Sequence, residues 1–137
     1  MSYDELVKGR IYFGGAADAE QAIANEAIDL VIDVRVNGRE EAVDYHYIHA
    51  PIADESNEIP TSIKSGVNEV VEAYEAGKNI YIHCGSGGGR AGVMAVATLL
   101  ELGLAENLAD AEVKAKAARP VINVRPNMKT ALEELYK

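Results

Sequence analysis

Cysteine is nearly absent from this sequence of 137 residues, which contains Cys84 alone. A single thiol cannot form an internal disulfide, so we expect a protein of a reducing compartment and place it in the cytoplasm. Long apolar runs are absent as well. The longest, Val93–Leu100 with one threonine, is far shorter than the ~20 residues of a transmembrane helix, and we expect no membrane partner.

Basic residues are in deficit. The chain has 13 lysines and arginines against 22 aspartates and glutamates, which gives a formal charge of −9. This balance argues against nucleic acid as the main partner, because a phosphate backbone favours clustered lysine and arginine. It leaves phosphorylated substrates open, because the electrostatic field at one site can differ from that of the whole molecule.

Histidine is also scarce, and the three histidines form no metal-ligand pattern. His46 and His49 fall on one predicted strand, where positions three apart point to opposite faces of a sheet. The chain has no His-x-x-x-His pair and no second cysteine. We therefore expect no metal ion and no cofactor.

Glycine, by contrast, is concentrated in one place, because five of the 12 glycines lie between Gly85 and Gly92. The segment His83–Arg90 follows a strand-like run and precedes an apolar, helix-like run over 91–102. Glycine reaches φ > 0 without steric cost, so such a loop can curl with its N–H groups pointing inward. A ring of N–H groups at a helix N-terminus binds anions. The pattern predicts a strand, a phosphate-sized loop and a helix.

A nucleophile and a clamp stand at the two ends of this loop. A thiol among N–H dipoles at a helix N-terminus favours its thiolate, so Cys84 can act as a nucleophile. Arg90 supplies a planar guanidinium that can hold two phosphoryl oxygens, and we expect a phosphate or sulfate ion to bind here. His83 is expected to orient the loop and to stabilise the thiolate. The predicted substrate-binding residues are His83, Gly85, Ser86, Gly87, Gly88, Gly89 and Arg90.

The pattern His-Cys-x-x-Gly-x-x-Arg, which begins at His83, resembles the phosphate-binding loop of the cysteine-dependent protein tyrosine phosphatases. The length of the chain is similar to that of their compact dual-specificity branch. Four further segments match that family in order: Gly9–Gly15, Leu30–Arg35, Tyr47–Asp54 and Arg125–Asn127. The resemblance implies a single phosphatase domain over residues 1–137. It also implies a metal-independent phosphomonoester hydrolase that works through a phosphocysteine on Cys84.

The resemblance further implies phosphorylated proteins as substrates, phosphotyrosine first and phosphoserine or phosphothreonine next. Small phosphomonoesters and RNA 5′ phosphates stay open. Arg119 and Arg125 flank a short segment before the last predicted helix. They are candidates for recruiting an acidic or phosphorylated substrate, although ordinary surface charge would explain either one.

The leaving group of a phosphomonoester needs a proton donor, and a carboxylic acid on a nearby loop can supply it. Asp54 follows an apolar predicted strand and opens a polar loop. It also matches the acid loop of the family in order and in distance ahead of Cys84. Glu55 and Glu58 are the alternatives in the same loop.

One position departs from the family. Most members carry serine or threonine directly after the arginine of the loop, whereas this chain has Ala91. The resemblance implies that this hydroxyl helps the cysteine leave when the phosphoenzyme is hydrolysed. Its absence predicts a slow second step and an accumulating phosphocysteine.

The glycine loop also fits other functional patterns. Gly87-x-Gly89-x-x-Gly92 satisfies the dinucleotide-binding fingerprint, but a helical pattern follows where a second strand ending in an acidic residue is needed. A Walker loop is excluded because no Gly-Lys-Ser/Thr occurs. A rhodanese-like sulfur transferase and a phosphotyrosine-binding module without turnover stay as alternatives. So does a tight turn with a buried structural cysteine.

The periodicity of apolar residues predicts an α/β fold with a mostly parallel central sheet of four to five strands flanked by helices. The predicted strands cover 10–13, 29–34, 45–52 and 79–83. The predicted helices cover 18–27, 61–76, 90–102, 108–118 and 127–136, with Asp18 as an N-cap and Gly77 as a C-cap. This topology puts the glycine loop at the carboxyl end of a central strand, where open α/β sheets bind ligands.

Overall fold

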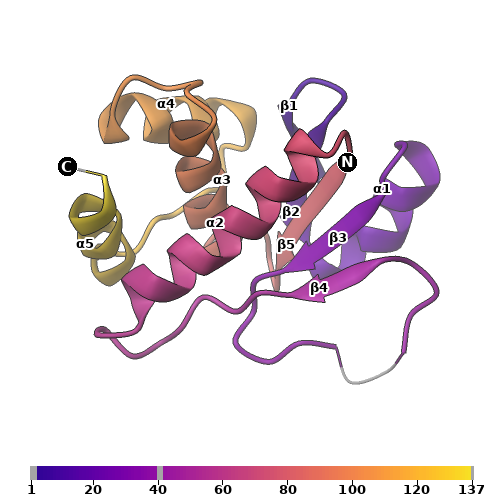
Figure 1. Ribbon diagram of the computed structural model, residues 1–137, viewed down its shortest axis with the longest axis horizontal. Helices are drawn as coiled ribbons and strands as arrows, with labels where there is room; N and C mark the ends of the chain where they lie inside the picture. Colours follow the sequence, from indigo (N-terminus) through magenta and orange to yellow (C-terminus); the bar gives the residue numbers. More distant parts are fainter. Residues whose placement is uncertain (1–2, 40–41, 137) are drawn as a thin grey trace.

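The computed structural model describes residues 3–39 and 42–136, and its centre is a five-stranded β-sheet (Figure 1). The strands are β1 (Tyr3–Val7), β2 (Ile11–Gly15), β3 (Leu30–Asp33), β4 (Tyr47–His49) and β5 (Ile80–Cys84). Their order across the sheet is β1-β2-β5-β3-β4. Neighbouring strands are parallel except β1 and β2, which pair antiparallel. The predicted α/β fold with a mostly parallel sheet is confirmed.

Helices pack against both faces of this sheet. They are the 3₁₀ helix η1 (Ala16–Asp18), α1 (Ala19–Asn25), α2 (Ile59–Glu75), α3 (Arg90–Glu101), α4 (Leu108–Ala118) and α5 (Pro126–Leu135). Ile80 and Ile82 of β5 face a core to which α2, α3, α4 and α5 contribute. Tyr81, between them, faces the other side and packs in a cluster with Ala22 of α1. Because successive side chains of a strand point to opposite faces, β5 is buried on both.

The sequence patterns do not predict β1. It is an edge strand whose pairing with β2 runs from Tyr3 opposite Gly14 to Val7 opposite Ile11. Its charged residues are tolerated because an edge strand has one open side. They also weaken the apolar pattern on which strand prediction depends.

Strand β4 is shorter than the predicted 45–52. Its partner β3 ends at Asp33, which pairs with His49, so the regular ladder stops there. The chain beyond β4 stays close to the end of β3, because the N–H groups of Ala50 and Ile52 donate to the carbonyls of Asp33 and Val34. The segment after β4 therefore belongs to a loop that remains anchored to the sheet.

Prolines shift the starts of two helices. Pro60 and Pro126 lie in the first turns of α2 and α5, where a missing N–H costs nothing, and both helices begin slightly earlier than predicted. Gly77 follows the end of α2 with φ of +85°, the left-handed conformation expected of a helix-terminating glycine. Asp18 stands at the N-cap of α1, but its side chain makes no capping hydrogen bond.

The topology fixes where a site can form. β5 lies between β2 and β3 and runs parallel to both, so the carboxyl ends of all three lie at one edge of the sheet. The loop 85–89 joins that end of β5 directly to α3. Within the described ranges, no helix combines the length and the apolar character needed to cross a membrane.

Candidate active site

The loop between β5 and α3 wraps around the sulfur of Cys84. This residue ends β5 and has only 5% of its surface exposed. The N–H of Gly87 donates a hydrogen bond to Sγ at 3.1 Å. The backbone dipole therefore points at the sulfur, an arrangement that stabilises negative charge there.

Gly87 carries the backbone conformation on which this contact depends. Its φ is +83°, in the left-handed region that side chains rarely adopt. A Cβ at this position would lie 2.5 Å from the carbonyl carbon of Gly14, which is closer than atoms can approach. Both the conformation and the close packing on β2 require glycine here.

Arg90 begins α3 and reaches across to the loop after β4. Its Nε donates to the carbonyl oxygen of Ile52 at 2.8 Å, and its Nη2 forms an ion pair with Oδ1 of Asp54. The side chain of Asp54 is 72% exposed. The structure therefore brings together Cys84, Arg90 and Asp54, three residues that sequence reasoning selected from distant segments.

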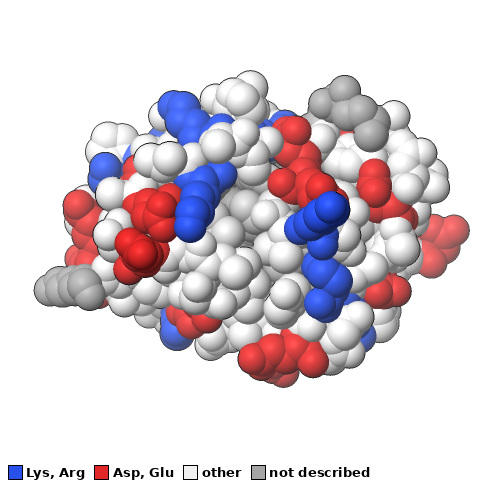
Figure 2. Space-filling model, turned by 90° about the horizontal axis from the view of Figure 1, so that it is seen from above, with Lys and Arg blue, Asp and Glu red and all other residues white. Residues whose placement is uncertain are grey.

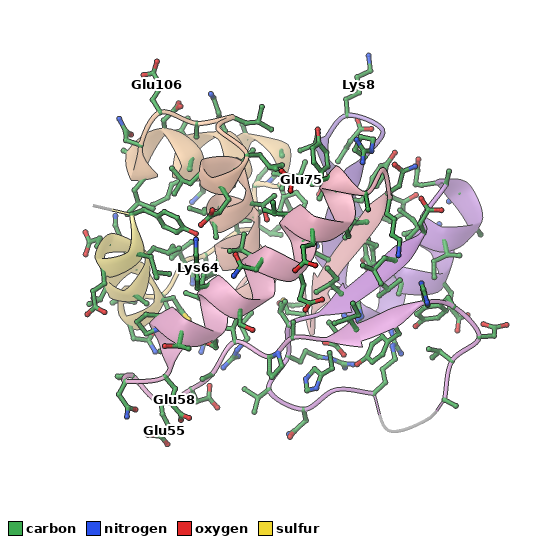
Figure 3. The ribbon with its side chains drawn as sticks, in the orientation of Figure 1. Lys8, Glu55, Glu58, Lys64, Glu75 and Glu106 are labelled. Atoms are coloured by element: carbon green, nitrogen blue, oxygen red, sulfur yellow. The ribbon has the colours of Figure 1, made fainter. Side chains whose placement is uncertain are left out.

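Glu55 and Glu58, the alternative acids, lie differently. Figure 3 shows both at the outer edge of the molecule, on the loop that leads into α2. Neither pairs with Arg90 among the contacts of the described residues. Their position makes Asp54 the carboxylate of this loop that lies nearest to the guanidinium.

A cavity of about 230 Å³ opens over the thiol. It is lined by Arg35, Cys84, Gly85, Ser86, Gly89, Arg90, Val93, Asn123, Arg125 and Met128. The lining includes four of the seven predicted substrate-binding residues, and the side facing the cavity does not include Gly87 or Gly88. Arg125 reaches the cavity, whereas Arg119 does not. A larger groove of about 780 Å³ lies on the other side of Asp54, between the loop after β4 and α2.

His83 is fully buried and does not line the cavity, which corrects its assignment as a substrate-binding residue. Its Nδ1 lies 3.2 Å from the carbonyl oxygen of Cys84. A carbonyl only accepts hydrogen bonds, so Nδ1 carries the proton in this contact. Burial lowers the pKa of His83, although the nearby Asp33 opposes this shift. A neutral His83 therefore orients the Cys84 carbonyl and supplies no positive charge to the thiolate.

Asp33 is a buried residue of the site that sequence reasoning did not select. It ends β3 and is fully buried, with Arg35 donating to both carboxylate oxygens at 3.0 and 2.8 Å and the Tyr47 hydroxyl donating at 2.6 Å. Burial alone would raise the pKa of Asp33, but these hydrogen bonds outweigh burial and lower it. The ionised carboxylate fixes Arg35 at the rim of the cavity. The sequence did offer one signal for Asp33, because it stands at the end of an apolar predicted strand.

Residues that could hold a metal ion do not cluster here. Across residues 3–39 and 42–136, no group of three or more histidine, cysteine, aspartate and glutamate side chains is arranged to do so. The charged groups that can meet an anion in the cavity are the guanidinium groups of Arg35, Arg90 and Arg125.

Comparison with family models matches residues 11–137 to the family described as "Dual specificity phosphatase, catalytic domain". The match covers most of the chain, so the chain belongs to this family. It is accordingly a phosphatase of the protein-tyrosine and dual-specificity class, as the loop motif led us to expect. Comparison with curated protein sequences gave no significant match.

Solved structures show the same fold. Human DUSP28 superposes with a TM-score of 0.81 at 21% identity, covering 98% of this chain and 93% of that chain. Tk-PTP in its active form gives 0.80 at 22% identity, covering 98% and 95%. A mouse protein described as a dual specificity phosphatase, complexed with zinc tungstate, gives 0.81 at 19% identity and covers 98% and 86%.

Proposed function

We propose that this phosphatase is a metal-independent phosphomonoester hydrolase that acts through a phosphocysteine on Cys84. The observation that carries the proposal is the Gly87 N–H donated to Sγ within a loop that ends at Arg90. This arrangement supports a thiolate nucleophile beside a cradle for phosphoryl oxygens. The proposed catalytic domain spans residues 1–137, and the single reduced thiol is consistent with work in the cytoplasm.

The proposed reaction has two steps. In the first, Sγ of Cys84 attacks phosphorus, an S–P bond forms, and the bond to the leaving oxygen breaks with its electron pair on that oxygen. Protonated Asp54 supplies the proton. In the second, the Asp54 carboxylate accepts a proton from water, the water oxygen attacks phosphorus, and the S–P bond breaks to restore the thiolate and release inorganic phosphate.

Arg90 and the loop N–H groups take the role of electrostatic stabilisers. The planar guanidinium can donate two parallel hydrogen bonds to equatorial phosphoryl oxygens, and the N–H groups of 85–90 supply further donors. Dipoles fixed before the reaction stabilise developing charge without reorganising. A neighbour's complex with tungstate, a tetrahedral oxyanion, is consistent with such a cradle.

Asp54 and the substrate compete for one donor. Nη2 of Arg90 is engaged by the Asp54 carboxylate, and it is also a group that would bind phosphate. A dianionic phosphate entering the cavity therefore draws Arg90 away from Asp54. Asp54, once released from the guanidinium, is free to act as the acid of the first step.

The proposed substrates are phosphorylated proteins, with phosphotyrosine first and small phosphomonoesters as surrogates. Arg125 lines the cavity, and no carboxylate pairs with it among the described residues, so it can meet acidic groups beside the scissile phosphate. Because Ala91 offers no hydroxyl at the start of α3, hydrolysis of the phosphocysteine is expected to be the slow step.

The test is steady-state hydrolysis of p-nitrophenyl phosphate in EDTA by the wild-type protein and Cys84→Ser. The proposal predicts activity in EDTA for the wild type and none above background for the variant. Full activity in Cys84→Ser would overturn it. Loss of activity in EDTA with recovery on adding a divalent metal would overturn its metal-independent form. Activity on thiosulfate would favour the sulfur-transferase alternative. Binding of phosphate without turnover would favour a phosphotyrosine-binding module.

A further inference from the structure

Arg119 is an arginine that the reaction above does not use. It follows the end of α4 and is only 6% exposed, which is rare for a charged side chain unless it is paired and hydrogen-bonded. Its Nε donates to the Gly87 carbonyl oxygen at 2.9 Å, and its Nη2 to the Ser86 carbonyl oxygen at 3.3 Å. Its Nη1 donates to Oδ2 of Asp4 at 2.8 Å. The guanidinium thus binds the outer side of the loop, and the inner side of the loop faces the thiol.

The two gripped carbonyls belong to peptide groups that matter for the site. In a trans peptide the C=O and the following N–H point in opposite directions. The Ser86 carbonyl shares its peptide with the Gly87 N–H, which donates to Sγ of Cys84. The Gly87 carbonyl shares its peptide with the Gly88 N–H, which lies 3.3 Å from the Ser86 hydroxyl oxygen. Holding both carbonyls outward therefore holds both N–H groups on the inner side.

We propose that Arg119 is a positioning residue that orients and polarises the phosphate-binding loop through its outward carbonyls. The guanidinium charge withdraws electron density from the two peptide groups, which makes their N–H groups stronger donors. Arg119 lies outside the cavity lining, so it acts on the thiolate and on a bound oxyanion only through the backbone. This inference rests on the proposed function of the loop.

Asp4, near the start of the chain, supplies the carboxylate that pairs with Arg119. It lies on β1, the edge strand that the sequence did not predict, and the end of α4 lies beside that strand (Figure 1). Its carboxylate neutralises the buried guanidinium and holds it in the plane in which Nε and Nη2 both reach the loop. Lysine could not replace this geometry, because a single ammonium offers no planar fork. β1 thereby contributes to the site without touching the cavity.

The experiment compares Arg119→Lys and Arg119→Gln with a matched control, Arg10→Lys. Arg10 also binds two backbone carbonyls, those of Tyr74 and Lys78, but at the opposite end of β5. Three readouts are needed: binding of inorganic phosphate by calorimetry, kcat/KM for p-nitrophenyl phosphate, and the pH profile of Cys84 alkylation by iodoacetamide. Removing a donor directly from an oxyanion site costs about 10²–10³-fold in rate, so we expect about tenfold for this indirect effect.

The inference predicts that both Arg119 variants bind phosphate about tenfold more weakly, lose kcat/KM in parallel and shift the alkylation profile to higher pH. Arg10→Lys should lower the thermal midpoint and leave all three readouts unchanged. Arg119→Lys, which keeps the positive charge but lacks the planar fork, covers the case in which Arg119→Gln does not fold.

Unchanged phosphate affinity and an unchanged alkylation profile in Arg119→Lys would overturn the inference, even if the protein were less stable. Equal losses in Arg10→Lys would also overturn it, because the effect would then follow stability alone. A different result would contradict the proposed function without deciding the role of Arg119. A wild-type protein that binds phosphate but hydrolyses no phosphomonoester would contradict the reaction, and the phosphate-binding comparison would still decide the role of Arg119.

Discussion

At the scale of single residues, the site depends on how each charge is compensated. Arg90 is paired with Asp54, Arg35 with Asp33, and Arg119 with Asp4. Each pair joins a cation near the loop to a carboxylate from another segment or from the end of a strand. Substrate phosphate can displace only the exposed pair, since Asp33 is fully buried and Arg119 nearly so. The Arg90–Asp54 ion pair is thus the one in which a substrate phosphate can replace the carboxylate.

Asp54→Asn tests the general acid. The amide can still accept a hydrogen bond from Arg90 but cannot supply a proton, and general acid catalysis contributes about 10²–10⁴-fold. We expect kcat/KM, which reports the first step, to fall within that range for phenyl phosphate or a phosphotyrosine peptide. The loss should be smaller for p-nitrophenyl phosphate, whose leaving group needs less protonation. Glu58→Gln, at the outer edge of the same loop, is the control, and an equal loss there would contradict the assignment of Asp54.

His83→Asn tests the buried neutral imidazole. Because burial lowers the pKa of His83 in the folded state, the unfolded state binds more protons below its ordinary pKa of about 6.5. The free energy of unfolding should therefore fall as the pH drops from about 7.5 to about 5.5. Asparagine can donate to the same carbonyl but cannot titrate, so the variant should lose less. Urea unfolding at both pH values measures this, and parallel losses would refute it.

The sequence was enough to predict residues whose chemistry depends on near neighbours in the chain. It was not enough to predict residues whose partner lies far away in the chain. Cys84 and Arg90 stand in one short motif, and Asp54 was predicted from its place after a strand and from the match to the family's acid loop. Arg119 was expected at the surface because nothing in its neighbourhood reveals that Asp4, far away in the chain, would bury it. Long-range compensation of this kind depends on tertiary packing rather than on local pattern.

At the scale of elements, the unit of function is β5, the loop 85–89 and α3. Sequence periodicity predicted this unit well, because β5 and α3 are almost wholly buried and their apolar runs are long. It predicted edges poorly. β1 was not predicted, because it is a strand only through its pairing with β2. β4 was predicted too long, because its regular pairing stops where β3 ends. The starts of α2 and α5 lie one or two residues earlier than predicted, where proline occupies the first turn, and α1 begins one residue later than predicted.

Gly87→Ala tests the geometry of this unit. A Cβ would lie 2.5 Å from backbone of Gly14 and 2.8 Å from Nη2 of Arg119, at a residue with φ of +83°. We expect the loop to distort and phosphate affinity to fall by about tenfold or more, since both the Sγ contact and the carbonyl grip are disturbed. Gly9→Ala is the control, because Gly9 has a similar φ of +71° but open space around it. Weakened phosphate binding in both variants would point to a general loss of stability instead.

At the scale of the whole molecule, net charge and local charge differ. The chain carries −9, yet the cavity over Cys84 is lined by three arginines and no carboxylate. Figure 2 shows one face on which basic side chains form separate groups among acidic ones, around an uncharged hollow. An anionic substrate therefore meets a positive site on a negative protein. Composition describes the net charge of the whole chain and could not reveal this local field.

Phosphate should stabilise the entire fold through this site. A ligand that binds only the folded state adds about 2.7 kcal/mol at roughly a hundredfold excess over its Kd, which raises the thermal midpoint by several degrees. We expect this rise for the wild type in inorganic phosphate relative to chloride of equal ionic strength. Arg90→Gln should lose most of it. An equal rise in the variant would mean that phosphate acts on the solvent or at another surface.

The central claim is that Cys84 carries the phosphoryl group, and stopped-flow hydrolysis of p-nitrophenyl phosphate in EDTA tests it most directly. We predict a burst of nitrophenol whose amplitude approaches the enzyme concentration, because Ala91 leaves the second step slow. The burst should vanish in Cys84→Ser. A linear trace from the first turnover would contradict the slow second step, and a burst that survives in Cys84→Ser would contradict the nucleophile itself.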